Sequence, residues 1–123
     1  MLTIFANFRI DSTERLENMK RSFFSFHNAN IKNWVLNIRG DKKNEAKEFL
    51  EKNITQNFKI FMYNSSNGWF YDTKNLCSNY LSDYIFCWNE DHVNVNTIEK
   101  FDYFIEKIKK NNIDQFIYSW FHL

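Results

Sequence analysis

The stretch LTIFANFRIDSTERLENMKRSFFSF, residues 2–26, combines the two patterns from which the rest of the chain is built. Its first part, Leu2–Phe8, is a short apolar run with the length and composition of a buried strand. In its second part, apolar side chains recur at helical spacing, at Leu16, Met19, Phe23 and Phe26. The segment therefore predicts a strand followed closely by a helix that packs on it.

The same alternation of patterns continues to the end of the chain. A helical pattern fills each interval between the further strand patterns, which lie at Asn33–Arg39, Phe58–Tyr63, Asp83–Trp88 and Gln115–Phe121. Crossover helices between strands are typical of a mostly parallel sheet. Most of the strand patterns are nearly continuous apolar runs, which indicates that helices cover both faces of the sheet. The prediction is an α/β fold in three layers, with about five strands and four helices, forming a single domain over residues 1–123.

Polar residues before the helical patterns predict how the helices begin. Asp11 with Glu14, and Asn96 with Glu99, have the spacing of a capping box, in which two side chains satisfy free backbone N–H groups. Asp41 is the candidate cap of the second helix.

Composition excludes several classes of protein. Hydrophobic residues make up 44% of the chain, too many for a disordered protein. The net charge is +1 and no basic block is present, which argues against a nucleic-acid partner. Two glycines in total leave no GxGxxG fingerprint and no phosphate-binding P-loop, which disfavours dehydrogenases and P-loop NTPases.

The sequence also carries information on compartment. Cys77 and Cys87 match no CxxC pattern and lie in apolar stretches, so we expect reduced thiols. No apolar run reaches the length of a membrane span, and the N-terminus lacks the profile of a signal peptide. These features predict a cytoplasmic protein.

The most distinctive stretch for chemistry is DYIFCWNEDH, residues 83–92. A buried strand there delivers Glu90, Asp91 and His92 to its carboxyl end, where ligands bind in doubly wound sheets. Two adjacent carboxylates can hold Mg²⁺ or Mn²⁺, which would bridge to phosphate oxygens. We take Glu90 and Asp91 as candidate metal ligands and His92 as a further candidate. The alternative, a solvated polar turn, has about equal support from the sequence.

The ends of the first two strands supply candidate nucleotide contacts. Asn7 and Arg9 precede a helix N-terminus, where free N–H groups and the helix dipole favour an anion. Asp41, after Gly40, could accept hydrogen bonds from a ribose or a base. For Asp41 the competing explanation is helix capping.

In this order of elements the chain resembles the GT-A glycosyltransferases, especially the family-2-like enzymes of bacterial surface polysaccharide synthesis. Leu2–Phe8 looks like their first strand, Val35–Asp41 lies where their nucleoside loop should be, and Tyr84–His92 lies where their acidic DxD-type motif should be. The resemblance implies a Rossmann-like, GT-A-like fold that binds a nucleotide-diphosphate sugar and a divalent cation. In this interpretation Asn7, Arg9 and Asp41 contact the nucleotide, and Glu90 and Asp91 contact the metal.

The chain departs from that family in three ways. The family's proline and tyrosine-asparagine pattern in the first strand is missing, and Arg39-Gly40-Asp41 replaces an acidic pair. Asn89-Glu90-Asp91 is a variant of DxD with asparagine first. The half of the family's fold that binds the acceptor and supplies the base is not evident, so no catalytic residue is assigned.

Two other functions remain open. The first is a non-catalytic α/β interaction module, whose final apolar strand recruits a partner or forms a homo-oligomer. The same apolar strand at the end also fits a domain with a missing C-terminal region. The second is a receiver-like or phosphatase-like acidic site, which we rank last because the first strand ends without a nucleophilic aspartate.

Overall fold

The computed structural model, which describes residues 2–80 and 84–116, contains a four-stranded, all-parallel sheet in the order β3-β2-β1-β4. The strands are β1 (Leu2–Arg9), β2 (Ile31–Arg39), β3 (Asn57–Phe61) and β4 (Tyr84–Cys87). The helices alternate with them as α1 (Thr13–Phe24), α2 (Lys43–Asn53), α3 (Trp69–Tyr80) and α4 (Ile98–Lys110). The predicted α/β class, with a parallel sheet and four helices, is confirmed.

The predicted fifth strand, Gln115–Phe121, is not confirmed. Gln115 and Phe116 are not in a strand, and residues 117–123 lie outside the described residues. After α4 the chain turns at Asn112, whose φ of +51° is one that asparagine tolerates better than most residues. The predicted fourth strand, Asp83–Trp88, corresponds to β4, and its first residue lies outside the described residues.

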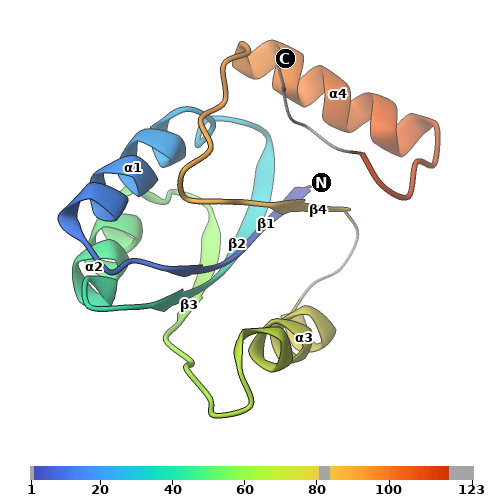
Figure 1. Cartoon of the computed structure of the whole chain (residues 1–123). Helices are drawn as coiled ribbons and strands as arrows, with labels where there is room; N and C mark the ends of the chain where they lie inside the picture. Colours follow the sequence, from blue (N-terminus) through green and yellow to red (C-terminus); the bar gives the residue numbers. More distant parts are fainter. Residues whose placement is uncertain (1, 81–83, 117–123) are drawn as a thin grey trace, which may run out of the picture.

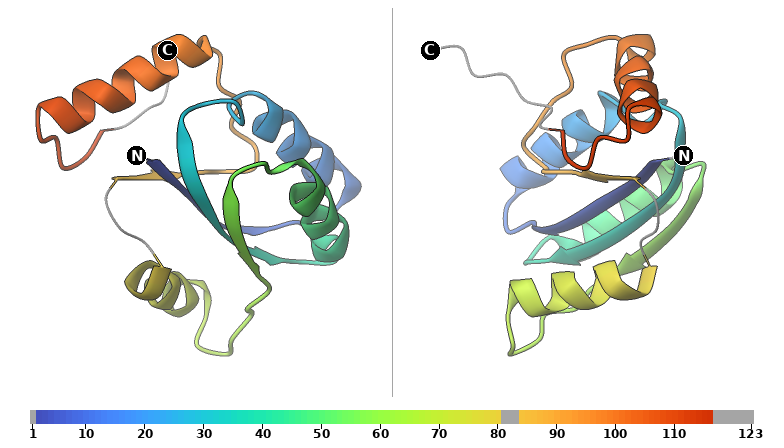
Figure 2. Two further views of the ribbon diagram at one scale, coloured as in Figure 1. Left: turned by 180° about the vertical axis from the view of Figure 1, so that it is seen from behind. Right: turned by 90° about the vertical axis from the view of Figure 1, so that its right-hand side faces the viewer.

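The main core lies on one face of the sheet. Figures 1 and 2 show α1, α2 and α4 on this side and α3 alone on the other. Alternate strand residues point into this core and meet buried side chains of the three helices, among them Phe23, Leu50 and Phe101. Its centre is a group of aromatic rings, in which Phe23 and Phe26 contact both Trp34 and Trp88. The centre of the main core is therefore aromatic rather than aliphatic.

The opposite face of the sheet is much more polar. It buries a small apolar cluster of Phe5, Val35 and Leu76, which packs α3 on the sheet. Thr3 and Asn37 are buried beside it. Strand residues thus alternate between an apolar and a partly polar face. Helices lie on both faces of the sheet, as the sequence predicts (Figures 1 and 2). Long apolar runs in β1 and β2 concealed the alternation because most of their few polar residues fall on one face.

The helix caps differ from those predicted by one residue in each case. Ser12, not Asp11, caps α1, and its Oγ accepts the N–H of Arg15 at 3.2 Å. Thr97, not Asn96, caps α4 through the N–H of Lys100. Position 42, not Asp41, is the N-cap of α2, and no side chain caps this helix.

No helix within residues 2–80 and 84–116 is long and apolar enough to cross a bilayer.

Candidate functional site

The loops that follow β1 and β2 are joined at the carboxyl edge of the sheet. The N–H of Ile10 donates to the carbonyl oxygen of Arg39 at 2.7 Å, and the N–H of Lys42 donates to the carbonyl oxygen of Ile10 at 2.8 Å. The Asp11 carboxylate accepts from Arg9 Nε at 2.9 Å and from the backbone N–H of Asp41 at 3.4 Å. The predicted nucleotide residues Arg9 and Asp41 are therefore brought together, with Asp11 between them.

Gly40 makes this close approach feasible. Its φ is +104°, and a Cβ there would lie 2.4 Å from the carbonyl oxygen of Ile10 and 2.7 Å from Asp11 Oδ1. We expect Gly40→Ala to lower the free energy of unfolding by about 2–4 kcal/mol, through backbone strain and the clash together. Gly68→Ala is the matched control, because Gly68 has a φ of +93° but no neighbouring atom within 4 Å of the position that a Cβ would take.

Gly68→Ala should lower the free energy of unfolding by about 1 kcal/mol, from backbone strain alone. Urea unfolding of both variants measures the two values. Equal losses in the two variants would show that the contact between the β1 and β2 loops does not depend on Gly40.

Two arginines lie side by side at this edge. Arg9 and Arg39 are direct partners in the register of β1 and β2, an arrangement in which like charges destabilise a sheet. The Nε–H of Arg39 is buried without a hydrogen-bond partner among the described residues. Burial, then the positive charge of Arg9, lower the pKa of Arg39, while the Asp72 and Asp11 carboxylates oppose the shift. The edge thus holds one buried guanidinium donor that the neighbouring carboxylates leave without a hydrogen bond among the described residues.

Asn7 is part of a hydrogen-bond network within the protein. Its side chain donates to Thr73 Oγ1 at 2.8 Å and accepts from Asn37 Nδ2 at 2.9 Å. The same Asn37 amide accepts the N–H of Tyr63 and donates to its carbonyl oxygen. The Trp69 indole N–H donates to the backbone oxygen of Asn7 at 2.7 Å. Asn7 therefore ties β1 to β2 and α3, and its contact with a nucleotide stays a prediction.

The strand that precedes the acidic loop, β4, is shorter than β1 and ends before the carboxyl end of β1. β4 pairs with β1 only from Leu2 to Phe5, and the N–H of Trp88 adds one last bond to the Phe5 carbonyl oxygen. The chain then crosses to α1, where Ser22 Oγ donates to the His92 carbonyl oxygen and accepts the Trp88 indole N–H. The loop is therefore fixed against the last turn of α1.

Glu90 and Asp91 lie beside the first turns of α1. With Ser12, Arg15 and other α1 residues they line a hollow of about 240 Å³. Glu90 is the more enclosed carboxylate, with its side chain 18% exposed and its Oε1 3.8 Å from Arg15 Nη1. The Asp91 side chain is 67% exposed, and its Oδ1 lies 3.7 Å from His92 Nε2. The two predicted metal ligands and His92 are thus adjacent in the chain. Glu90 faces Arg15, whereas Asp91 is largely exposed and faces His92.

These residues fit a metal only as part of a larger set of ligands. Within residues 2–80 and 84–116, no three His, Cys, Asp or Glu side chains come together in a way that could hold a metal ion. Mg²⁺ commonly takes one or two carboxylates and completes its coordination with water and substrate phosphates. Glu90 and Asp91 can serve in that way. They do not form a cage that would bind a metal alone.

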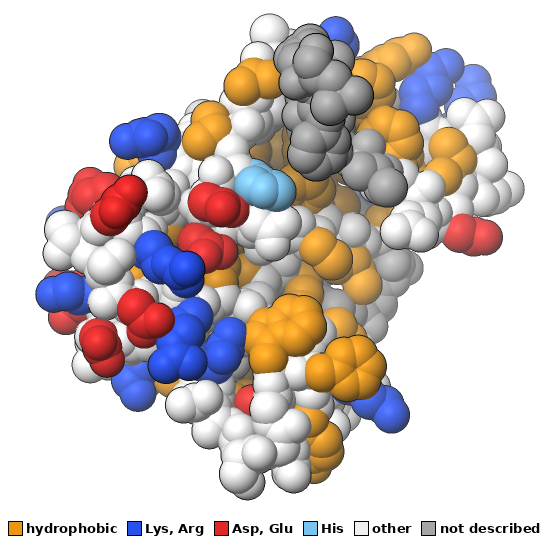
Figure 3. Space-filling view, viewed as in Figure 1, with side chains coloured by type: hydrophobic (Ala, Val, Ile, Leu, Met, Phe, Trp, Pro, Cys, Tyr) orange, Lys and Arg blue, Asp and Glu red, His pale blue; other side chains and the backbone are white. Residues whose placement is uncertain are grey.

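Sequence reasoning overlooked three residues of this edge. Arg39 ends the second strand as Arg9 ends the first, but the sequence pattern assigns it no role. Arg15 donates to the Arg9 carbonyl oxygen at 3.0 Å and faces Glu90, so it links the β1 loop to the acidic loop. Trp69, at the start of α3, is exposed beside Asn7. Figure 3 shows charged side chains of both signs over the α1 and α2 side, and hydrophobic side chains around α3.

No family model, curated protein or solved structure gives a significant match to this chain.

Proposed function

We propose that this chain is a glycosyltransferase domain, or its donor-binding half, which binds a nucleotide-diphosphate sugar at the carboxyl edge of the sheet. The process we propose for it is bacterial surface polysaccharide synthesis, in the cytoplasm, where the free thiols Cys77 and Cys87 would stay reduced. The strand order supports a nucleotide ligand. Doubly wound sheets that bind dinucleotides begin with the order 3-2-1-4 and bind them where that order reverses, between β1 and β4.

The observation that carries the proposal is the pairing of Arg9 with Arg39. Guanidinium groups bind phosphate with two parallel hydrogen bonds, so a diphosphate would relieve the repulsion between them. It would also supply an acceptor for the buried Nε–H of Arg39. Without an anion the same arrangement costs free energy, because a buried donor is left unpaired.

Each neighbouring group has a role in this proposal. Asp41 would accept from the ribose or the base, and the exposed Trp69 ring offers a surface for the base to stack on. Glu90 and Asp91 would hold Mg²⁺ or Mn²⁺, with His92 beside them. The cation, when bound, neutralises charge on the diphosphate leaving group. Arg15 would keep Glu90 and the β1 loop in place through its two contacts.

The direct test is thermal unfolding with a panel of nucleoside diphosphates, with and without Mn²⁺. We expect one nucleotide to stabilise the native state by roughly 2.7 kcal/mol at a hundredfold excess over its Kd, and only with Mn²⁺. Asp91→Ala should lose the metal-dependent part of this stabilisation. Asp114→Ala, which removes an exposed carboxylate after α4, should keep all of it.

A nucleotide that stabilises the protein equally with and without Mn²⁺ would contradict the assignment of Glu90 and Asp91. If no nucleoside diphosphate stabilises the folded chain, the donor site itself is wrong.

The second candidate is an interaction module that recruits a partner or a second copy. Large hydrophobic side chains around the start of α3 favour it, since Phe70 is 74% exposed and Trp69 and Tyr71 are exposed beside it. Thermal unfolding with nucleoside diphosphates separates the two candidates, because these nucleotides are not expected to stabilise an interaction module.

A further inference from the structure

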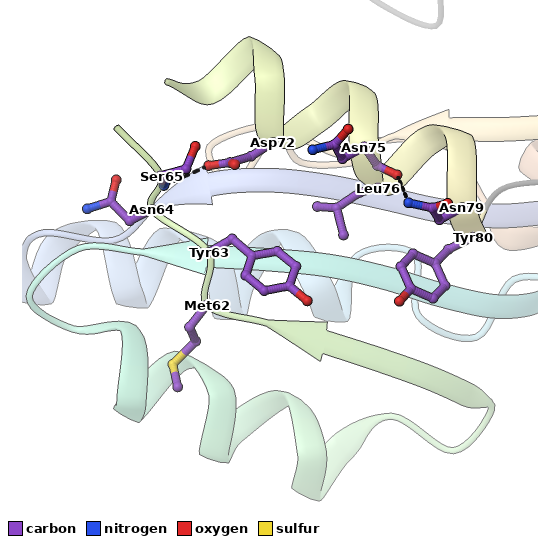
Figure 4. A pocket seen from close by; sticks show the side chains of 9 residues that line it. All are labelled: Met62, Tyr63, Asn64, Ser65, Asp72, Asn75, Leu76, Asn79 and Tyr80. Carbon is purple, nitrogen blue, oxygen red and sulfur yellow. Dashed lines mark hydrogen bonds between the residues drawn. The ribbon is translucent and has the colours of Figure 1, made fainter. Parts of the chain in front are cut away.

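A groove lies between α3 and the segment that follows β3, on the polar side of the sheet (Figure 4). Its volume is about 650 Å³, within the range of small-ligand pockets. Its polar and aromatic lining comes mainly from Tyr63, Ser65, Asp72, Asn75, Asn79 and Tyr80. None of the five residues predicted for the nucleotide and metal is among the residues that line it.

One end of the groove holds a buried carboxylate and a buried hydroxyl. Asp72 is 5% exposed, and its Oδ2 accepts the backbone N–H of Ser65 at 3.1 Å, the bond drawn beside these residues in Figure 4. The Oγ of Ser65 is buried with no hydrogen-bond partner in the part of the chain that the structure describes. A buried hydroxyl is costly to leave unpaired, so this end of the groove is suited to a ligand with hydroxyl groups.

Aromatic rings form another wall. Phe61 packs between Tyr63 and Tyr80, with ring centroids 5.1 and 5.0 Å apart. In Figure 4 the two tyrosines lie on either side of Leu76, which projects from α3. The negative faces of aromatic rings attract the slightly positive C–H groups of an apolar ring face. An aromatic wall is therefore suited to one face of a saturated ring.

The charge of the groove limits the class of ligand. Its only charged side chain among the described lining residues is the Asp72 carboxylate. Asn75 and Asn79 add amide groups, which both donate and accept hydrogen bonds. A phosphate or carboxylate ligand would be repelled by Asp72, whereas an uncharged ligand with many hydroxyls would find both donors and acceptors.

We propose that this groove binds an uncharged carbohydrate. One face of the sugar ring packs on Tyr63 and Tyr80, and its hydroxyls bond to Asp72, Ser65 and the amides of α3. The groove shares no lining residue with the proposed nucleotide site, and this proposal does not rest on that site.

The test is a titration of the ¹⁵N-labelled chain with glucose, galactose, mannose, rhamnose and N-acetylglucosamine. Sugar concentrations should reach about 20 mM, since a single sugar ring is expected to bind with a millimolar Kd. We expect shifts confined to residues 61–65 and to α3 with at least one sugar. Asn79→Ala should raise that Kd by about threefold or more, and Asp72→Asn by more than tenfold.

Asn44→Ala, which truncates an exposed asparagine on α2, is the matched control and should leave the Kd unchanged. The proposal is overturned if no sugar shifts the groove residues, or if Asn79→Ala and Asn44→Ala bind equally. It is also overturned if nucleoside diphosphates shift these residues more than sugars do. A normal nucleotide response in Asn79→Ala would show that the two sites are independent.

Discussion

Arg39→Gln should weaken nucleoside-diphosphate binding by about 10- to 100-fold, because a hydrogen bond to a charged group contributes about 1.5–3 kcal/mol. Arg39 is the less exposed member of the cross-strand pair with Arg9, and its buried Nε–H has no hydrogen-bond partner among the described residues. Glutamine keeps a polar side chain at this position and removes one of two adjacent positive charges. The variant is therefore expected to fold. Isothermal titration of uridine and guanosine diphosphates in the presence of Mn²⁺ gives the Kd for each protein.

Arg21→Gln provides the comparison for this measurement. Arg21 is exposed in the last turn of α1, away from the carboxyl edge of the sheet, and its replacement removes the same charge. The Kd of this variant should match that of the original chain. If both variants bind equally weakly, only the net charge of the protein matters and the paired arginines do not form a phosphate site.

Phe23→Ala should lower the free energy of unfolding by about 3–5 kcal/mol and Tm by roughly 10–20 °C. Phe23 is fully buried in α1, and its ring contacts Trp34, Phe49 and Trp88. Alanine removes these contacts and leaves a cavity that the surrounding rings cannot fill. Calorimetry measures the loss directly.

The next residue is a matched control in the same helix. Phe24 is 53% exposed, and truncating it should cost about 1 kcal/mol, mostly from its edge contacts with Phe49 and His27. Similar losses for Phe23→Ala and Phe24→Ala would mean that the aromatic cluster is not the centre of the core.

The order of elements could be predicted from the sequence because each element has a strong local pattern. α1 is an example, since Leu16, Met19 and Phe23 recur on one helix face and all are buried. The cap of α1 was missed by one residue because Asp11, Ser12 and Thr13 are all good cap residues, and local sequence does not choose among them. Element boundaries and caps depend on backbone geometry that periodicity does not describe.

The arrangement of the candidate site could be predicted only in part. The strand patterns correctly placed Arg9, Asp41 and the acidic loop at the carboxyl ends of β1, β2 and β4. That a ligand binds there stays a prediction. The pairing of Arg9 with Arg39 follows from the register of β1 and β2, which is a tertiary property. The bond from Asn7 to Thr73 joins residues 66 positions apart, and no local pattern indicates it.

The network around Asn37 has a consequence for the thermodynamics of binding. Asn37 is fully buried, and its one amide group bonds to Asn7 on β1 and to both backbone groups of Tyr63. These bonds fix the backbone around the carboxyl edge of the sheet, so its conformational entropy is lost when the chain folds. A ligand that binds there has to restrict only exposed side chains such as Arg9, so most of the entropy loss is already complete before the ligand arrives.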